Sequence, residues 1–458
     1  MSSTKLFKNV RLKGQKELTS ILVEDGVFKR ISADLPERAG CEVIDLQGQL
    51  VIPPYVDPHM HLDYVFTAGL GEENGSGTLF EGIQRWSESK GHMTVEQMKE
   101  RIYSGIRKEM LNGVQAIRTH IDVTDPTFTG LKAALEVRDE VKDILDLQIV
   151  AFPQEGMYAY KGGDELVEEA LKMGADCVGA IPHFELAREF GEKSVHKAIE
   201  LAVKYDKLLD AHCDETDDTQ SRFLELLNAL ALMEGIGTRT TASHTCSFGS
   251  ADNSYAFRMM KLFKKSGINF ISCPTENVYL EGRQDTYPKR RGITRVKELY
   301  DNGINVCFAQ DSMSDPWYPL GNGNMMMILD HGIHLAQMMS PEEITNDLDL
   351  VTTNGAITMS ITDRYGIEEG KPANFIVLDA KSEFEAICER AGITASVRHG
   401  EYLFEKNPGK GYRSNRPAEI RGNNSCFSAR ILLSLTTLSQ AKVIAGKGGM
   451  EKRHQVVL

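Results

Sequence analysis

The sequence predicts an α/β protein in which a (β/α)8 TIM barrel is joined to a small β-sandwich domain built from both ends of the chain. Eight short apolar runs alternate with amphipathic segments. A parallel sheet that is buried on both faces needs such near-continuous apolar strands. The runs together span about 260 residues, which is the usual size of one barrel. The length of 458 residues therefore leaves room for a second, smaller domain.

The chain begins with short strand-like runs and turns over residues 1–52, and the Asp25-Gly26 pair is a hairpin signal. We expect these residues to form the N-terminal part of the β domain, and residues 53–366 to form the barrel. Between the strands, segments such as Leu166–Met173 carry apolar residues at helical spacing. The predicted barrel strands are 50–58, 115–120, 147–152, 177–182, 208–212, 241–244, 268–273 and 304–309.

After about residue 366 the pattern returns to strands and turns, with Asn374–Asp379 as the clearest strand. We expect residues 367–420 to pair with residues 1–52 and to complete the β domain. Residues 421–458 show no pattern continuous with what precedes them. They are predicted to form an irregular tail, and no function is assigned to it.

Composition excludes several classes of partner. The net charge is −13 and the chain has no long basic block, which argues against binding to nucleic acid. No run approaches the ~18 apolar residues of a membrane span, and the first residues lack the apolar core of a signal peptide. The eight cysteines form no CxxC pair. We therefore expect a cytoplasmic protein with neither a nucleic-acid nor a membrane partner.

Polar side chains follow each of the predicted barrel strands. His59 and His61 are two residues apart, so an extended backbone presents both on one face. Catalytic groups in such barrels come from the carboxyl ends of the strands. A single histidine at a strand end is usually structural. The occurrence of such polar residues at the ends of successive strands is what indicates a site. The strand-end residues are His59, His61, His120, Asp122, Gln154, Glu155, His183, Glu185, His212, Glu215, His244, Glu276 and Asp311.

Some of these residues lie in longer motifs. The stretch Asp57-Pro58-His59-Met60-His61-Leu62-Asp63 resembles the metal motif of the amidohydrolase superfamily. Residues 152–156, 212–215, 242–245 and 315–321 closely resemble bacterial cytosine deaminases of the barrel type. The similarity runs from about residue 45 to about residue 380 and so covers most of the chain.

The resemblance implies that His59, His61, His212 and Asp311 hold one divalent metal ion, Fe2+ or Zn2+. Neutral imidazoles with one carboxylate suit either metal. Such an ion lowers the pKa of a bound water toward neutrality. The fourth strand and the residues after it, 177–185, contain no lysine that could carry a bridging carbamate. One ion is therefore expected rather than two.

The remaining roles follow from what hydrolytic deamination requires, since the ring nitrogen must be protonated before water adds beside it. Glu215 is expected to carry that proton, and His244 and Asp311 to orient and deprotonate the water. The Gln154 amide offers a donor and an acceptor, which suit the carbonyl and N–H of a cytosine-like ring. Trp317 either covers the ring or packs at the barrel top, and both interpretations stay open.

Three departures from the family concern the substrate, and one of them is the divergent loop 273–279, which carries an extra acidic group. Ser312 stands where the cytosine deaminases carry a second Asp, and Gln310 replaces a His. The smaller Ser312 would leave room beside the ring. We predict metal-dependent hydrolytic deamination of cytosine or a closely related small heterocycle, with release of ammonia, by a homo-oligomer. The alternatives are a preference for 5-substituted cytosine or creatinine, a cyclic-amide hydrolase, and a metal-binding protein without activity.

Overall fold

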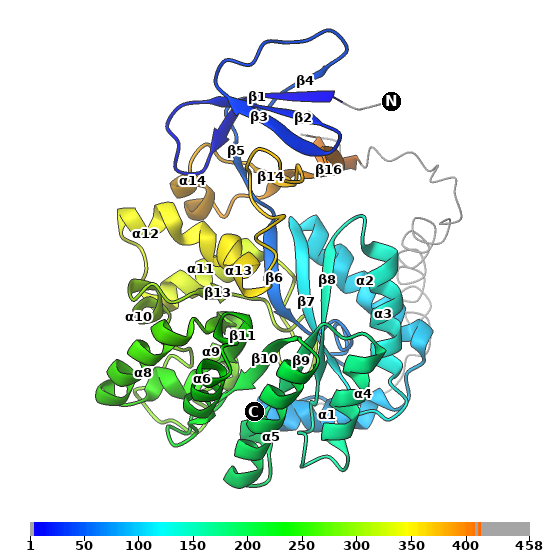
Figure 1. Ribbon diagram of the computed structural model, residues 1–458, viewed down its shortest axis with the longest axis vertical. Helices are drawn as coiled ribbons and strands as arrows, with labels where there is room; N and C mark the ends of the chain where they lie inside the picture. Colours follow the sequence, from blue (N-terminus) through cyan, green and yellow to red (C-terminus); the bar gives the residue numbers. More distant parts are fainter. Residues whose placement is uncertain (1–3, 408–410, 414–458) are drawn as a thin grey trace, which may run out of the picture. The chain divides into compact units, whose positions relative to one another are not determined.

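The computed structural model describes residues 4–407 and 411–413. One of its two sheets has eight strands, each of which pairs in parallel with the next along the chain. Helices lie on the outer side of these strands (Figure 1). The predicted α/β barrel is therefore confirmed. Its strands are β6 (Tyr55–Met60), β7 (Val114–Asp122), β8 (Asp146–Phe152), β9 (Cys177–Ala180), β10 (Leu208–Cys213), β11 (Thr240–His244), β12 (Asn269–Ser272) and β13 (Val306–Phe308).

Local sequence signals explain where helices begin and end. Helix α2 (Val95–Leu111) starts in a capping box formed by Thr94 and Gln97. Helix α4 (Gly163–Met173) ends at Gly174, as its sequence predicts. The other helices are α1 (Leu79–Lys90), α3 (Thr129–Val141), η1 (Pro182–Phe184), α5 (Arg188–Lys204), α6 (Phe223–Met233), η2 (Gly237–Arg239), α7 (Cys246–Ser250), α8 (Asn253–Ser266), α9 (Pro274–Leu280), α10 (Val296–Asp301), α11 (Met325–Ala336), α12 (Pro341–Asn346), η3 (Asp347–Val351), α13 (Thr353–Thr358) and α14 (Glu383–Cys388).

The first and last barrel strands meet through a short seam. The sheet runs from β6 to β13, and its two ends are joined by a parallel bridge between Met60 and Asp311. The Asp311 N–H donates to the His59 carbonyl at 2.9 Å, and the His61 N–H donates to the Asp311 carbonyl at 3.2 Å. Backbone hydrogen bonds thus hold three of the predicted metal ligands next to one another.

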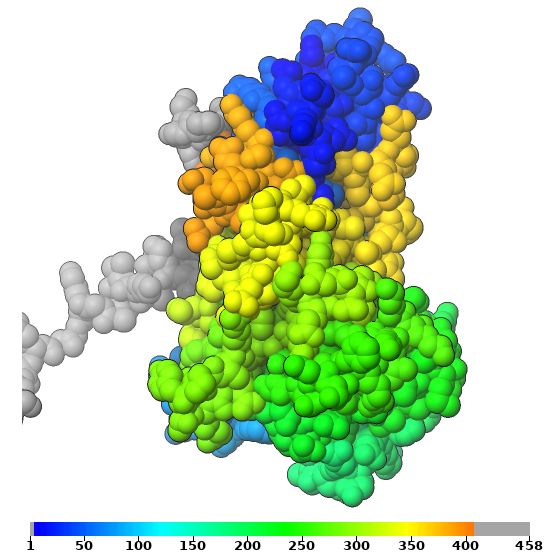
Figure 2. All heavy atoms as spheres, turned by 90° about the vertical axis from the view of Figure 1, so that its left-hand side faces the viewer, coloured from blue at the N-terminus to red at the C-terminus, as the bar shows by residue number. Residues whose placement is uncertain are grey.

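A second sheet is built from both ends of the chain, as the sequence predicts. Its order is β17-β16-β15-β14-β5-β1-β2-β3, and β4 pairs with β1. Both ends contribute buried side chains, among them Phe7, Val51 and Phe375. N-terminal residues in blue lie beside C-terminal residues in orange and yellow (Figure 2). The strands are β1 (Thr4–Leu12), β2 (Thr19–Glu24), β3 (Val27–Ser32), β4 (Glu42–Asp45), β5 (Leu50–Ile52), β14 (Phe375–Leu378), β15 (Ile393–Arg398), β16 (Glu401–Asn407) and β17 (Gly411–Arg413).

One predicted strand, residues 50–58, is divided in the structure. Residues 50–52 form β5, which pairs with β1 and β14 in the second sheet, and the barrel strand β6 begins only at Tyr55. Pro53 and Pro54 separate the two because proline has no N–H to donate to a strand ladder. The predicted tail, 421–458, lies outside the described residues. Within the part of the chain that the structure describes, no helix has the length and apolar character needed to cross a membrane.

Candidate active site

Three imidazole rings and one carboxylate converge at the carboxyl end of the barrel strands. The Nε2 atoms of His59 and His61 lie 3.2 and 3.1 Å from the Nε2 atom of His212. The Oδ1 atom of Asp311 lies 3.5 Å from the Nε2 atom of His59 and 3.5 Å from that of His61. All four side chains are buried. Donors held about 2.0–2.2 Å from a tetrahedral ion are themselves about 3.3–3.6 Å apart, so this spacing fits one metal ion.

The neighbours of His59 determine which of its ring nitrogens faces the cluster. The Ser243 hydroxyl donates to Asp210 Oδ1 at 2.6 Å, so its oxygen is left to accept from His59 Nδ1 at 3.0 Å. The proton therefore sits on Nδ1, and Nε2 presents a lone pair to the cluster. Arg118 donates to the other oxygen of Asp210 at 2.9 Å. A hydrogen bond like the one from His59 Nδ1 to Ser243 orients a metal-binding histidine and makes it a stronger ligand.

Burial keeps these imidazoles neutral. The pKa of His59, His61 and His212 is lowered well below its usual value, first by the loss of water around each ring and then by neighbouring histidines. Metal ions bind the neutral form of the ring. Among the described residues, Asp311 Oδ2 has no hydrogen-bond partner. The donor set therefore fits a divalent ion of the zinc or iron type.

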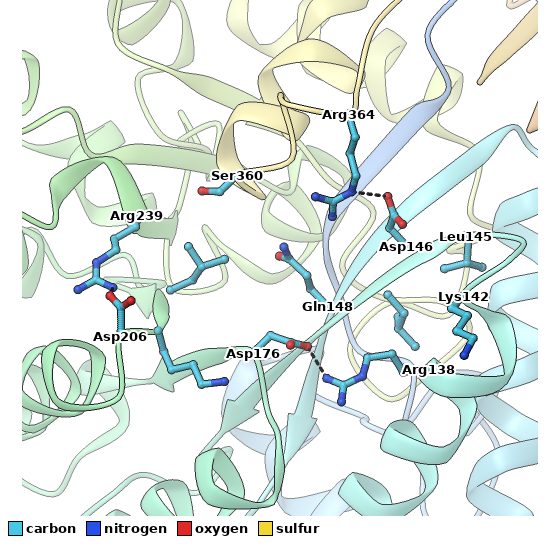
Figure 3. Close-up of a pocket in the computed structure, with 13 residues that line it drawn as sticks. Arg138, Lys142, Leu145, Asp146, Gln148, Asp176, Asp206, Arg239, Ser360 and Arg364 are labelled. Atoms are coloured by element: carbon cyan, nitrogen blue, oxygen red, sulfur yellow. Dashed lines mark hydrogen bonds and ion pairs between the residues drawn. The ribbon is translucent and has the colours of Figure 1, made fainter. Parts of the chain in front are cut away.

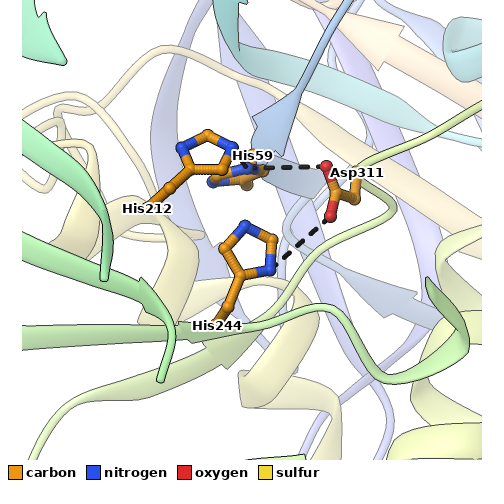
Figure 4. Close-up of side chains that lie close together, drawn as sticks. All are labelled: His59, His212, His244 and Asp311. Carbon is orange, nitrogen blue, oxygen red and sulfur yellow. Dashed lines mark hydrogen bonds and ion pairs between the residues drawn. The ribbon is translucent and has the colours of Figure 1, made fainter. Parts of the chain in front are cut away.

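Glu215 and His244 lie beside this cluster and are joined by Asn277. The Cys273 N–H donates to Asn277 Oδ1 at 3.3 Å, which fixes the orientation of the amide. The amide nitrogen then donates to Glu215 Oε1 at 3.2 Å and to His244 Nδ1 at 3.1 Å. His244 consequently carries its proton on Nε2, and burial lowers its pKa to about 3. Figure 4 shows how the His244 ring points toward Asp311, whose Oδ2 lies 3.7 Å from His244 Nδ1.

Glu215, the predicted proton carrier, has a carboxyl group whose pKa is strongly perturbed by its surroundings. Burial raises its pKa well above the usual value, and the charges of Glu276 and Glu281 raise that pKa further. Such surroundings favour the protonated form of the carboxyl group. The side chain is also tied to one fixed neighbour, Asn277.

Gln154 and Ser312, two predicted substrate contacts, are both buried, and each has a side-chain oxygen atom without a hydrogen bond to another described residue. Gln154 follows β8, and Ser312 is the residue after Asp311. Within the described part of the chain, Gln154 Oε1 and Ser312 Oγ have no hydrogen-bond partner. Buried polar atoms are rarely left unpaired, so Gln154 Oε1 is available to a ligand, whereas the Ser312 hydroxyl also lies close to the carboxyl groups of Glu276 and Asp315.

Trp317 packs between helix α1 and the metal cluster. Its indole N–H donates to the Leu79 carbonyl at 3.2 Å, and a Cβ atom at Gly82 would overlap its ring. Its ring lies 4.5 Å from the Tyr64 ring, between centroids, and Tyr64 in turn stacks on His61 at 4.6 Å. These contacts favour the packing interpretation, and contact with a substrate stays a prediction.

Several residues that support the site were not assigned roles from the sequence: Asp210, Ser243, Asn277 and Tyr64. A signal for Asp210 was present, because Asp210 and His212 are two residues apart on β10 and so share a face. Asn277 gives no comparable signal, since its contacts depend on the turn after β12.

The backbone is strained at two of the site residues. His244 has φ +67° and Asp311 has φ +68°, in the left-handed region that residues other than glycine seldom adopt. Such conformations persist where the surroundings over-determine them, and they cluster at functional sites. For Asp311 the backbone hydrogen bonds of the barrel seam supply that constraint.

A separate pocket of about 720 Å³ lies at the opposite, amino end of the strands (Figure 3). Its lining includes Asp146, at the start of β8, and Asp176, just before β9. These charges are paired: Arg138 donates to Asp176 at 2.8 Å, and Arg364 donates to Asp146 at 3.4 Å. Chemistry in barrels takes place at the carboxyl end, whereas the amino end stabilises the fold. This pocket is therefore not the candidate active site.

With this geometry in view, comparison with known proteins defines the class. The sequence model of the Amidohydrolase family matches residues 42–403. The chain belongs to the amidohydrolase family, and it is a hydrolase that acts on carbon–nitrogen bonds.

Individual relatives show which activities occur among proteins similar to this chain. The crystal structure of 5-methylcytosine deaminase from Klebsiella pneumoniae, liganded with phosphonocytosine, has a TM-score of 0.86 and 50% sequence identity, covering 89% of this chain and 100% of that one. N-isopropylammelide isopropyl amidohydrolase from Pseudomonas sp. (strain ADP) is 28% identical over 373 residues, which is 79% of this chain and 88% of that protein. Pterin deaminase from Rhizobium rhizogenes is 24% identical over 393 residues, or 85% and 88% of the two chains.

Proposed function

We propose that the protein is a metal-dependent hydrolytic deaminase of the cytosine ring, and that its preferred substrate carries a substituent at position 5, as in 5-methylcytosine. The observation that carries this proposal is that His59 and His61 each lie 3.1–3.5 Å from both His212 and Asp311, beside the buried carboxyl of Glu215. The 50% identity to a 5-methylcytosine deaminase supports the same chemistry here.

The metal ligands in this proposal are the four clustered side chains. His59, His61, His212 and Asp311 would hold one divalent ion, Fe2+ or Zn2+. When it is bound, the ion makes a water molecule acidic enough to react near neutral pH.

The other residues bind the ring and move protons. The Gln154 amide pairs with the ring carbonyl and the adjacent N–H. Glu215 delivers a proton to the ring nitrogen next to the reacting carbon, which makes that carbon more electrophilic. His244 donates a hydrogen bond from Nε2, and Asp311 offers its free Oδ2 to a proton of the attacking water.

The small side chain of Ser312 supports the proposed preference for a ring with a substituent at position 5. Its side chain is smaller than the aspartate of the cytosine deaminases that the sequence resembles, and it is uncharged. A methyl group beside Ser312 would therefore have more room than beside an aspartate side chain, and a buried carboxylate at position 312 would be unfavourable next to that methyl group.

An ammonia-release screen tests the proposal. The substrates are cytosine, 5-methylcytosine, 5-fluorocytosine, isoguanine and creatinine, each with the iron-loaded and the zinc-loaded protein. We expect ammonia without ring opening, and the highest kcat/KM with 5-methylcytosine. Opening of cyclic amides without any ammonia would show that the proposal is wrong, and the two metal forms compared side by side identify the working ion.

A further inference from the structure

Glu276 is a buried carboxyl group that the chemistry above does not use. It lies in the first turn of α9, directly after β12. The side chain is 3% exposed, and in the part of the chain that the structure describes its Oε2 atom has no hydrogen-bond partner. A buried carboxyl oxygen without a donor is unfavourable, so this atom is expected to have a partner when the site is filled.

The position of Glu276 points to the candidate active site. One of its oxygens lies within 4.8 Å of a carboxylate oxygen of Glu215 and of a carboxylate oxygen of Asp311. The next residue, Asn277, donates to both Glu215 and His244. The first turn of α9 therefore faces the space between the proton carrier and the metal cluster.

That space is where the reacting carbon has to lie. In the proposed function, Glu215 delivers a proton to the ring nitrogen adjacent to this carbon. Asp311 lies on the side from which water attacks the carbon. One Glu276 oxygen lies within 4.8 Å of a carboxylate oxygen of each of these residues, which places it within reach of the remaining substituent of the same carbon. In an aminopyrimidine this substituent is the exocyclic amine, which carries N–H donors, and Glu276 Oε2 is an oxygen without a hydrogen-bond partner among the described residues.

We propose that Glu276 contacts the substrate, accepts a hydrogen bond from the exocyclic amine and orients that nitrogen as it leaves. This inference rests on the proposed function. The oxygen of water bonds to the amidine carbon, one water proton goes to the ring nitrogen through Glu215, and the second goes to the amine. The carbon–nitrogen bond then breaks with its electron pair on nitrogen, ammonia departs, and the oxygen lone pair forms the carbonyl.

Leaving-group dependence tests the role of Glu276. Steady-state kcat/KM is measured for the 4-amino ring and for the same ring with a 4-methoxy group, which leaves as methanol and offers no N–H. Glu276→Leu should lower kcat/KM on the amine about tenfold more than on the methoxy ring, the value of one lost hydrogen bond, because its effect on the pKa of Glu215 acts on both rings alike. Glu276→Gln keeps an acceptor oxygen and should restore most of the rate on the amine.

A control and a binding measurement separate this role from a structural one. Glu281→Gln removes a neighbouring acidic group next to Asp217 and should change both substrates equally. The Kd of pyrimidin-2-one, which has no substituent at the reacting carbon, should be unchanged in Glu276→Leu. If that variant does not fold, Glu276→Met takes its place in the same comparison.

The possible results are distinct. A selective loss on the amine supports the inference. An equal loss on both leaving groups, or no loss on the amine, overturns it while the ammonia released by the unaltered protein still supports the proposed function. If the unaltered protein releases ammonia from none of the rings, the proposed function fails and the role of Glu276 fails with it.

Discussion

Asp311 is connected to His59 twice, once through the backbone and once through the side chain. The Asp311 N–H donates to the His59 carbonyl at 2.9 Å, and Asp311 Oδ1 lies 3.5 Å from His59 Nε2. The two residues come from opposite ends of the barrel sheet. Closing the barrel and assembling the candidate metal centre are therefore one structural event.

Removing the metal ion should lower thermal stability as well as activity. A ligand that binds only the folded state stabilises it by about 4 kcal/mol when its free concentration is 1,000 times its Kd. Calorimetry with and without a chelator, followed by return of the ion, measures the shift in Tm. His212→Ala, which lacks one of the proposed ligands, should show a much smaller shift on chelation. An unchanged Tm for the unaltered protein would contradict the coupling.

Ser243→Ala should weaken metal binding although Ser243 is not itself a ligand. The substitution removes the acceptor for His59 Nδ1, so the ring loses its fixed tautomer and orientation. Loss of such an outer hydrogen bond lowers metal affinity roughly 10–100-fold. Competition with a chromophoric chelator measures this affinity. Ser247→Ala is the matched control, because the Ser247 hydroxyl is also largely buried but donates to the Ser221 carbonyl at 2.7 Å.

Glu215→Gln should retain the metal and lose most of the turnover. The amide cannot carry a proton to the ring nitrogen, and loss of general acid–base catalysis lowers rates roughly 10²–10⁴-fold. Elemental analysis and the rate of ammonia release are measured on the same preparation. Near-normal turnover with full metal content would refute the assigned role.

Ser312→Asp should shift preference toward unsubstituted cytosine. The added carboxylate would occupy the space beside position 5 and disfavour a methyl group there. The ratio of kcat/KM for 5-methylcytosine to that for cytosine should fall, whereas Ser312→Ala should leave the ratio near its original value. The same ratio in all three proteins would show that Ser312 does not set the preference.

Gly82→Ala should destabilise the protein by about 1–3 kcal/mol, the usual effect of overpacking. The new methyl group would overlap the Trp317 indole and push α1 away from it. Gly91, at the end of the same helix, has open space around it, so Gly91→Ala should change stability by less than about 1 kcal/mol. Urea unfolding of both variants measures the difference.

Local geometry explains which parts could be predicted from the sequence. Apolar runs fix the barrel strands, and a two-residue spacing fixes that His59 and His61 share a face. Contacts made through loops are different: Asn277 reaches Glu215 across 62 positions of sequence, and no periodicity encodes the turn that brings them together. The sequence could not decide between the two interpretations of Trp317 for the same reason, since its hydrogen-bond partner Leu79 lies 238 positions away.

The division of residues 50–60 by Pro53 and Pro54 has a practical consequence for protein engineering. The two prolines are all that separates the terminal sheet from the strand that carries His59 and leads directly into His61. Exchanging or trimming the chain ends would thus alter the tether of that strand, and grafts of this catalytic scaffold should keep the native junction from Leu50 to Tyr55 intact.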